Sequence, residues 1–191
     1  ETFERLEAYV ALIEKWNPKI NLVSKSSLPE IWDRHIWDSA QIFDISVEGS
    51  VWADFGSGGG LPGIVLAIFA KECRPDMQFY LVESDQRKCA FLRNAVREIG
   101  LKVKVHAERI EVLDPIGASV ISARALTDLN GLLGFVERHA AKNGVAILPK
   151  GETWEKEILQ AQENWSFKYE EITSKTNNNA TILKIKEFSR A

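Results

Sequence analysis

Apolar residues recur at three- and four-residue intervals near the start of the chain, a spacing that places them on one face of a helix. The first such helix is predicted over 3–16. Pro18 should end it, because the residue before a proline is driven away from helical backbone angles. The body of a second helix is predicted over 31–43. Ser27 and Glu30 lie three residues apart ahead of that body, and their spacing predicts a capping box.

Beyond residue 50 the pattern changes to short apolar runs that alternate with helical patterns. The runs that we interpret as strands are 51–55, 79–82, 103–106, 120–122 and 145–148. The predicted helices are 62–70, 86–99, 128–141 and 152–164, the third of them ending at Asn143-Gly144. Residues 167–172 and 180–185 flank the polar turn 174–179 and predict a final hairpin, which adds an antiparallel strand at the edge of the sheet.

Alternation of strand and helix is typical of a doubly wound α/β fold. We therefore expect an α/β protein with a mostly parallel, seven-stranded sheet that is covered by helices on both faces. Residues 1–48 would form an N-terminal helical extension, and residues 49–191 would form one compact domain. The 191 residues, 45% of them hydrophobic, are enough for a folded unit of this size.

A glycine-rich segment joins the first predicted strand to the next helix. Its sequence is Asp-Phe-Gly-Ser-Gly-Gly-Gly-Leu-Pro-Gly. Gly58, Gly60 and Gly63 match the G-x-G-x-x-G pattern of dinucleotide-binding proteins. A second register gives the D-x-G-x-G-x-G pattern of methyltransferases, with the residues Asp54, Gly56, Gly58 and Gly60. Either pattern predicts a ligand at the carboxyl end of the first strand, where open α/β sheets bind their ligands.

Three other strand ends carry candidate binding residues. Glu83 ends the second strand, where a carboxylate can accept hydrogen bonds from both hydroxyls of a ribose. Ala107 and Glu108 follow the third strand, where a small residue can flank an adenine and backbone groups can read its edge. Arg124 follows the fourth, where a guanidinium can bind a carboxylate or a phosphate. The plain structural alternatives are a solvated acid for Glu83 and a surface salt bridge for Arg124.

Several longer motifs make the chain resemble a known family. They are Lys-Trp-Asn-Pro-Lys-Ile-Asn-Leu-Val at 15–23, His-Ile-Trp-Asp-Ser at 35–39, the glycine segment with its Leu-Pro-Gly continuation, Leu-Val-Glu-Ser at 81–84, Ser-Ala-Arg-Ala at 122–125 and Pro-Lys-Gly at 149–151. With these motifs, nearly the whole chain resembles the bacterial 16S ribosomal RNA guanine-N7 methyltransferase family, also called glucose-inhibited division protein B. The resemblance implies the doubly wound sheet of S-adenosylmethionine-dependent methyltransferases.

The resemblance also implies a set of cofactor contacts. S-adenosylmethionine would be contacted by Gly56, Leu61, Ala107, Glu108 and Arg124, while the roles of Asp54, Gly58, Gly60 and Glu83 follow from the fold. Two positions depart from the family pattern. Ala123 separates Ser122 from Arg124, where the family has Ser-Arg-Ala, and Lys150 stands where an apolar residue is usual. The first departure puts the placement of Arg124 in question.

The reaction implied by the resemblance is methylation of N7 of a guanine in 16S ribosomal RNA, free or within the small ribosomal subunit. N7 carries a lone pair and no proton, so a direct in-line displacement needs no general base and depends on alignment. We therefore expect no catalytic constellation, with Arg124 as the candidate positioning residue. His35 and Asp38 share one helix face and either line the mouth of the site or tie the N-terminal helices to the domain.

The charge of the chain gives little support to an RNA substrate. A net charge of −3 is unusual for a nucleic-acid-binding protein, although residues 84–125 have a local basic excess. The candidate RNA contacts are Arg87, Lys88, Arg93, Arg124, Lys150, His35 and Asp38. The basic residues over 87–97 equally fit the solvated face of a helix.

Three alternatives stay open. The acidic balance favours a small-molecule methyltransferase, the overlapping glycine pattern keeps an NAD(P)-dependent oxidoreductase in view, and a binding module that has lost catalysis would keep the same pocket. Cys73 and Cys89 match no metal or redox motif, so no metal is expected. The charged first segment contains no signal region and no apolar run is long enough to span a membrane, so we expect a cytoplasmic protein, and a monomer.

Overall fold

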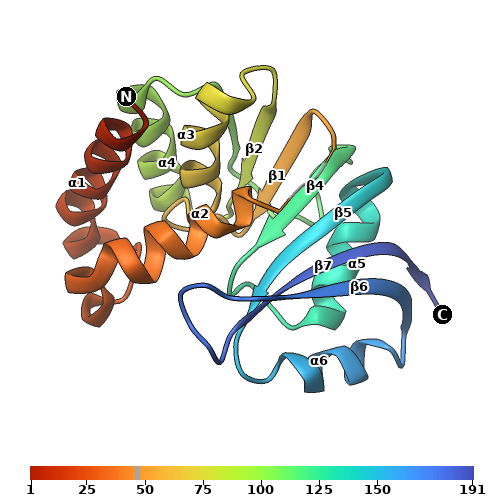
Figure 1. Ribbon diagram of the computed structural model, residues 1–191. Coiled ribbons are helices and arrows are strands. Elements are labelled where there is room, and N and C mark those ends of the chain that lie inside the picture. Colours follow the sequence, from red (N-terminus) through yellow and green to blue (C-terminus); the bar gives the residue numbers. More distant parts are fainter. Residues whose placement is uncertain (46–47) are drawn as a thin grey trace.

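A computed structural model describes residues 1–45 and 48–191 of the chain. Residues 46 and 47, near the end of the predicted extension, lie outside the described residues. The centre of the structure is a seven-stranded sheet in the order β3-β2-β1-β4-β5-β7-β6 (Figure 1). Neighbours from β3 to β5 pair in parallel, and β7 is antiparallel to both β5 and β6. The predicted fold class is therefore confirmed.

The strands begin and end close to the predicted positions in the first half of the sheet. Their bounds are β1 Val51–Phe55, β2 Gln78–Val82, β3 Val103–His106, β4 Ala118–Ala123, β5 Ala140–Lys150, β6 Trp165–Thr173 and β7 Thr181–Arg190. The prediction for β5 was too short at its start. The helix before it ends at His139 and the chain enters the strand at once, so Asn143-Gly144 lies within β5 rather than after the helix.

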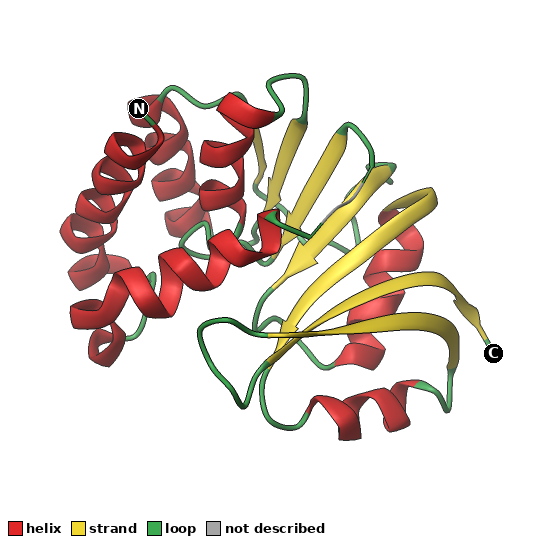
Figure 2. Cartoon of the chain, in the orientation of Figure 1, coloured by secondary structure: helices red, strands yellow, loops and turns green. Residues whose placement is uncertain are grey.

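Helices cover both faces of the sheet (Figure 2). The helices of the doubly wound part are α3 Gly63–Cys73, α4 Gln86–Ile99, α5 Leu129–His139 and α6 Trp154–Ala161. Residues of α3 and α4 share one hydrophobic cluster with Trp52 of β1. Residues of α5 and α6 share a second cluster with Phe55 of the same strand, on the other face of the sheet. Successive side chains of a strand point to opposite faces, and β1 therefore contributes to both cores.

The N-terminal extension packs on the same face as α3 and α4. It contains α1 (Thr2–Ile20), the short 3₁₀ segment η1 (Lys25–Glu30), the π-helical segment η2 (Trp32–Trp37) and α2 (Asp38–Phe43). Tyr9 and Ile13 of α1 belong to the same buried cluster as Ile64 and Leu66 of α3. The extension therefore shares a hydrophobic core with the sheet domain.

The prediction that Pro18 ends the first helix was wrong, because α1 continues to Ile20. The side chain of Asn17 explains the extra turn. Its Oδ1 accepts hydrogen bonds from the backbone amides of Leu22 (2.7 Å) and Val23 (2.9 Å), which fixes the chain as it leaves the helix. Asn21 then takes the left-handed conformation that commonly closes a helix.

The predicted capping box at Ser27 and Glu30 was also wrong. The Ser27 hydroxyl donates to the carbonyl of Ser24, and no side chain caps η1. His35 contacts the same hydroxyl through its Nε2, at 2.7 Å. The Ser27 hydroxyl, which local sequence rules assign to a helix cap, is therefore engaged in a tertiary contact with the imidazole instead.

The final hairpin is present, but its antiparallel strand is not at the sheet edge. β7 lies between β5 and β6, and β6 is the edge strand. The composition of the two strands explains this order. β7 buries Ile182, Leu183 and Ile185, whereas β6 is exposed along most of its length, including Glu170 and Glu171. The apolar strand occupies the inner position, and the charged strand protects the edge from pairing with other chains.

No helix within the described ranges is both long and apolar enough to cross a membrane.

Candidate functional site

The glycine segment forms a tight loop between β1 and α3, at the carboxyl end of the central strand. Gly56, Gly58 and Gly60 have φ angles of 61°, 55° and 87°, which L-residues with a side chain rarely adopt. The Ser57 amide donates to the carbonyl of Val82 (3.1 Å) and anchors the loop to β2. A Cβ atom at Gly58 would meet only the Gly56 carbonyl, 3.7 Å away. The loop therefore presents open backbone at Gly58.

The N-terminal extension supports this loop from the side. The Tyr9 hydroxyl of α1 donates to the carbonyl of Gly59 in a buried hydrogen bond. Leu22 packs against the same glycine, since a Cβ at Gly59 would lie 3.2 Å from the Leu22 Cβ and carbonyl oxygen. The Tyr9 contact could not be predicted from the sequence, where Tyr9 is only one of the apolar residues on a helix face.

Glu83 lies beside the loop at the end of β2. One carboxylate oxygen, Oε2, accepts from the Gly58 amide at 2.9 Å, and the other, Oε1, accepts from the Asp85 amide at 2.8 Å. Glu83 is 9% exposed. Each oxygen keeps a lone pair beyond the one used, so the carboxylate is held in place and can accept further hydrogen bonds from a pair of hydroxyls. Its neighbour Asp85 caps α4 by accepting from the Arg87 and Lys88 amides.

Asp54 lies beneath the loop, fully buried. Its Oδ1 accepts from the Ser122 hydroxyl (2.7 Å), which in turn accepts from the indole N–H of Trp52 (2.9 Å). Its Oδ2 faces Gly63 and makes no hydrogen bond of regular geometry. Burial raises the pKa of Asp54 to about 6, against the lowering effects of hydrogen bonds, chiefly from Ser122, and of the Arg124 charge. An incompletely compensated buried carboxylate creates a negative potential under the loop, which favours a cationic ligand.

We expect Asp54→Asn to remove a pH dependence of stability. The raised pKa means that the folded protein binds a proton more tightly than the unfolded chain. This stabilisation is present below the unfolded pKa of 3.8 and is lost as the pH rises through about 6. The loss amounts to at most ~3 kcal/mol in the free energy of unfolding. Urea denaturation of both proteins from about pH 4.5 to 7.5 measures it. Other titrating groups cancel in the difference, and parallel stability curves would contradict the expectation.

Arg124 and two residues of the extension meet at the end of β4. The Arg124 guanidinium donates to Asp38 Oδ2 at 3.4 Å and to His35 Nδ1 at 3.2 Å. Its side chain is 22% exposed. Ala125, which follows, has a φ of 51°, an angle that costs a residue other than glycine ~1 kcal/mol. The structure thus brings together three residues that the sequence placed 86 and 89 positions apart.

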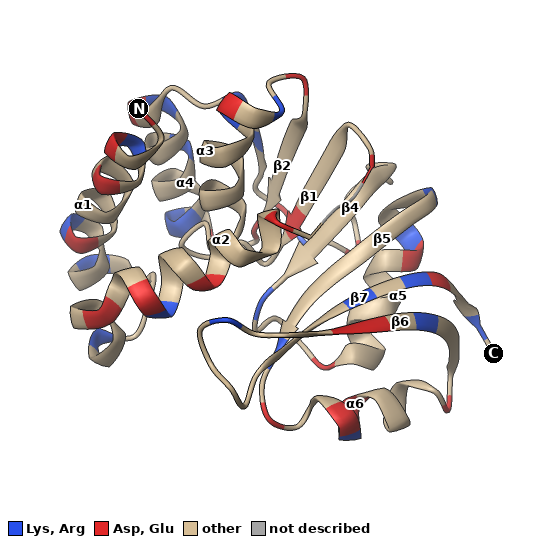
Figure 3. Ribbon diagram, in the orientation of Figure 1, with Lys and Arg blue, Asp and Glu red and all other residues tan. Residues whose placement is uncertain are grey.

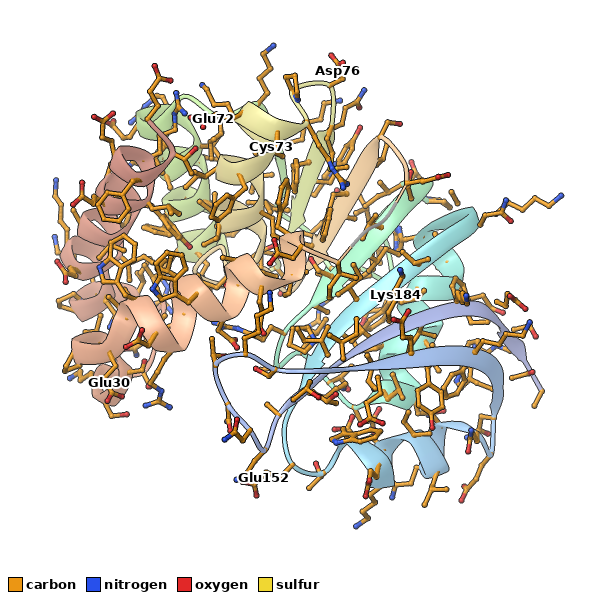
Figure 4. All side chains as sticks on the ribbon, viewed as in Figure 1. Glu30, Glu72, Cys73, Asp76, Glu152 and Lys184 are labelled. Carbon is orange, nitrogen blue, oxygen red and sulfur yellow. The ribbon has the colours of Figure 1, made fainter. Side chains whose placement is uncertain are left out.

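A cleft of about 490 Å³ opens beside Arg124. Its walls come from η2 and α2, from the chain after β4, from the end of β5 and from the β6–β7 loop. Gln41 of α2 fixes that loop, because its side chain donates to Ser174 and Thr176 (both 3.2 Å) and accepts from the Lys175 amide (2.8 Å). On the other side of the loop, the Asn179 side chain donates to Glu152, which follows β5 and lies beside the tip of the loop (Figure 4). Hydrogen bonds therefore hold this wall of the cleft at both sides.

The other predicted cofactor residues lie around the same end of the sheet. Ala107 and Glu108 follow β3, and the Ala107 carbonyl accepts from the Gln86 side chain at 3.2 Å. Glu108 is exposed, and its Oε1 lies 3.8 Å from the Nδ1 atom of His106. The side chain of Leu61 is buried in the hydrophobic core.

The predicted RNA-contacting cations are not gathered in one patch. Arg87 is exposed at the start of α4. Lys150, at 8% exposure, is bound to Glu157 (2.8 Å) and lines the cleft as part of that ion pair. Basic and acidic segments alternate along α1, β6 and β7 (Figure 3). Cys73 and Cys89 are free thiols, and no group of three or more potential metal ligands occurs within the described parts of the chain.

Fold and site together define the class of protein. A parallel sheet with one antiparallel strand next to its edge, a glycine loop after β1 and a fixed acid after β2 are the features of an S-adenosylmethionine-dependent methyltransferase. Solved structures agree in fold. The crystal structure of M. jannaschii TYW2 in complex with AdoMet has a TM-score of 0.61 and 15% identity, covering 91% of this chain and 80% of that one. A SAM-dependent methyltransferase from Aquifex aeolicus has a TM-score of 0.61 and 13% identity, covering 83% and 92%.

Sequence comparison gives the family. The family model described as rRNA small subunit methyltransferase G (GidB) matches residues 2–184. The protein named Ribosomal RNA small subunit methyltransferase G of Ruegeria pomeroyi is 55% identical, over 100% of this chain and 93% of its own length. The protein of the same name from Paracoccus denitrificans is 50% identical, over 95% and 93%. The chain belongs to the rRNA small subunit methyltransferase G family and is an S-adenosylmethionine-dependent methyltransferase.

Proposed function

We propose that this protein transfers the methyl group of S-adenosylmethionine to N7 of a guanine in 16S ribosomal RNA, by direct in-line displacement. The observation that carries the proposal is family membership over nearly the whole chain, combined with a cleft lined by Arg124, which follows β4 at the point where this strand pairs with the end of β1, ahead of the glycine loop. The relatives' shared name supports a ribosomal RNA of the small subunit as the substrate.

The residues around the loop fit the parts of the cofactor. The fixed Glu83 carboxylate matches the two ribose hydroxyls, and the open backbone at Gly58 matches a ligand that approaches closely. Ala107 and the backbone beside Glu108 directly follow β3, where they would flank the adenine. Arg124 matches the carboxylate of the amino-acid part, and the buried charge of Asp54 favours its cationic groups. When bound, the cofactor supplies an activated methyl group on a positively charged sulfur.

The protein's part in the chemistry is then to align the guanine with the methyl group and to exclude water from the site. Guanine N7 has no proton to lose, so the site needs no general base, and His35 is free for another role. Holding the two reactants about 3 Å apart in line converts a bimolecular step into an effectively intramolecular one. The hydrogen-bonded β6–β7 loop and α2 supply fixed walls for that purpose.

The state of the RNA follows from the position of N7. This atom lies on the major-groove edge, and the major groove of A-form RNA is too deep and narrow for protein to read. The target guanine therefore enters the cleft unpaired or splayed out. The cleft, whose walls are on different elements, receives one base rather than a duplex.

Methyl transfer from radiolabelled S-adenosylmethionine tests the proposal. The acceptors are small ribosomal subunits, naked 16S ribosomal RNA and a protein-free small-molecule extract, followed by nuclease digestion and chromatography of nucleosides. We expect label in 7-methylguanosine from at least one RNA acceptor. Label at another nucleoside contradicts the N7 assignment. Label confined to the extract supports a small-molecule methyltransferase, and tight cofactor binding without any product supports a binding module.

A further inference from the structure

Arg124 is held by a chain of hydrogen bonds that begins in the extension. An arginine side chain can only donate, so the His35 Nδ1 atom that contacts it at 3.2 Å must be an acceptor. The proton of the neutral imidazole is then on Nε2, which donates to the Ser27 hydroxyl at 2.7 Å. The Ser27 hydroxyl in turn donates a hydrogen bond to the Ser24 carbonyl at 2.9 Å. Every donor in this series of hydrogen bonds has an acceptor, and a single tautomer of His35 satisfies all of them.

Asp38 completes the arrangement from the other side of the guanidinium. Its Oδ2 faces Arg124, while its Oδ1 accepts from the Thr176 hydroxyl (2.7 Å) and from the side-chain Nε2 of Gln41 (3.0 Å). His35 and Asp38 therefore each fix one end of the guanidinium and are themselves fixed by other groups. Arg124 has five N–H donors, of which these two contacts occupy two. The remaining donors are available to an anion in the cleft.

Electrostatics keeps His35 in the accepting form. Burial lowers its pKa to about 4, assisted by the charges of Arg124 and Arg34 and opposed by Asp38. Among the described residues, the charges of these three groups act on the imidazole, and the Ser27 hydroxyl that its Nε2 contacts is neutral. A doubly protonated ring would present N–H to the guanidinium and break the contact. At neutral pH the ring is neutral, so the contact with Arg124 persists.

We propose that His35 is a positioning residue for methyl transfer, which holds Arg124 toward the cleft by accepting a hydrogen bond at Nδ1. The inference rests on the proposed role of Arg124 in binding the cofactor carboxylate. It gives a reason for the π-helical segment η2, because such insertions often re-aim a side chain at a functional site, and His35 lies within it. It also assigns the N-terminal extension a part in the chemistry of the site.

A purely structural role makes a different prediction. If His35 served only to tie η1 to η2, its contact with Ser27 would be the important one, and Nδ1 would be dispensable. The contributions of the two ring nitrogens can be distinguished by substitution of His35. The Oδ1 atom of an asparagine occupies the δ position and can accept from Arg124 without reaching Ser27. A glutamine reaches the ε position and can contact Ser27, but it leaves Arg124 without its acceptor.

Cofactor affinity by calorimetry and kcat/KM for methyl transfer are therefore measured for His35→Asn and His35→Gln, with thermal melts as a control for folding. We expect His35→Gln to weaken cofactor affinity and kcat/KM by about tenfold, the scale of a lost hydrogen bond to a charged group, and His35→Asn to stay close to wild type. The reverse order, or wild-type behaviour of both variants, overturns the proposal.

Nitrogen NMR gives an independent test, in which the tautomer is read from the wild-type protein and the pKa is compared between the wild type and Arg124→Met. Nitrogen chemical shifts of the imidazole report its tautomer, and we expect the Nε2–H form with a pKa near 4 that rises in Arg124→Met. An Nδ1–H tautomer, or a pKa unchanged by Arg124→Met, overturns the proposal. These measurements and the cofactor affinity do not involve RNA. A failure of 16S ribosomal RNA as substrate would therefore refute the proposed function while the role of His35 is still decided.

Discussion

Gly58→Asp should abolish binding of S-adenosylmethionine while the protein stays folded. The φ of Gly58 is 55°, and aspartate is one of the few residues that tolerate this left-handed conformation. A Cβ there meets no side chain, so the protein itself accommodates the substitution. The new carboxylate, however, would project from open backbone beside Glu83 and occupy the space of the ligand. Steric exclusion and repulsion of the cofactor carboxylate act together, so we expect calorimetry to detect no binding.

Gly58→Asn is the matched control, because asparagine has the same shape and the same tolerance of left-handed angles without the charge. It should retain weakened binding if repulsion contributes, and lose binding as fully as Gly58→Asp if exclusion alone acts. Circular dichroism and thermal melts establish that both variants fold. Wild-type affinity in Gly58→Asp would place the cofactor elsewhere and remove the glycine loop from the site.

Arg124→Ala should lower kcat/KM for methyl transfer by about 100-fold, the scale of a reactant misplaced by about 1 Å. Its effect on the free energy of unfolding should be only ~1 kcal/mol, because the side chain is partly exposed and its ion pair with Asp38 is long at 3.4 Å. Asp38 keeps its hydrogen bonds to Thr176 and Gln41 when the guanidinium is removed. Steady-state kinetics combined with urea denaturation separates the two effects.

Arg124→Lys provides the comparison for charge. A lysine keeps the positive charge but cannot donate to Asp38, His35 and a ligand in one plane. We expect it to recover only part of the lost activity. Full recovery would mean that Arg124 acts as a point charge, and a collapse of stability in Arg124→Ala would mean that its role is structural.

Local sequence rules predicted the first half of the sheet closely and the extension less well. The segments 51–55, 86–99 and 103–106 match β1, α4 and β3 in full, since each is bounded by strong signals such as the glycine loop or Gly100. The predictions based on Pro18 (the end of a helix) and Ser27 (a helix cap) were wrong, because other side chains changed the usual roles of these residues. Asn17 holds the chain beyond Pro18, and His35 takes the Ser27 hydroxyl.

Residues that a motif contains were predictable as parts of the site, and residues that act through tertiary contact were not. The glycine loop and Glu83 follow from a pattern with a known place in the fold. Tyr9 and Gln41 lie in no such pattern, and Ser122 lies in a motif that does not indicate its hydrogen bond to Asp54, although the three residues support the loop, the wall of the cleft and the buried carboxylate. Their partners lie 50, 134 and 68 positions away in sequence, so only the folded chain brings them together.

The long separation between α2 and the β6–β7 loop has a consequence for synthesis of the protein. The side chain of Gln41 leaves the ribosome early, but Ser174, to which it donates, is 133 residues downstream. The cleft wall therefore forms only when almost the entire chain has emerged. A nascent chain that stalls before the hairpin would hold the glycine loop and Arg124 but no closed cleft.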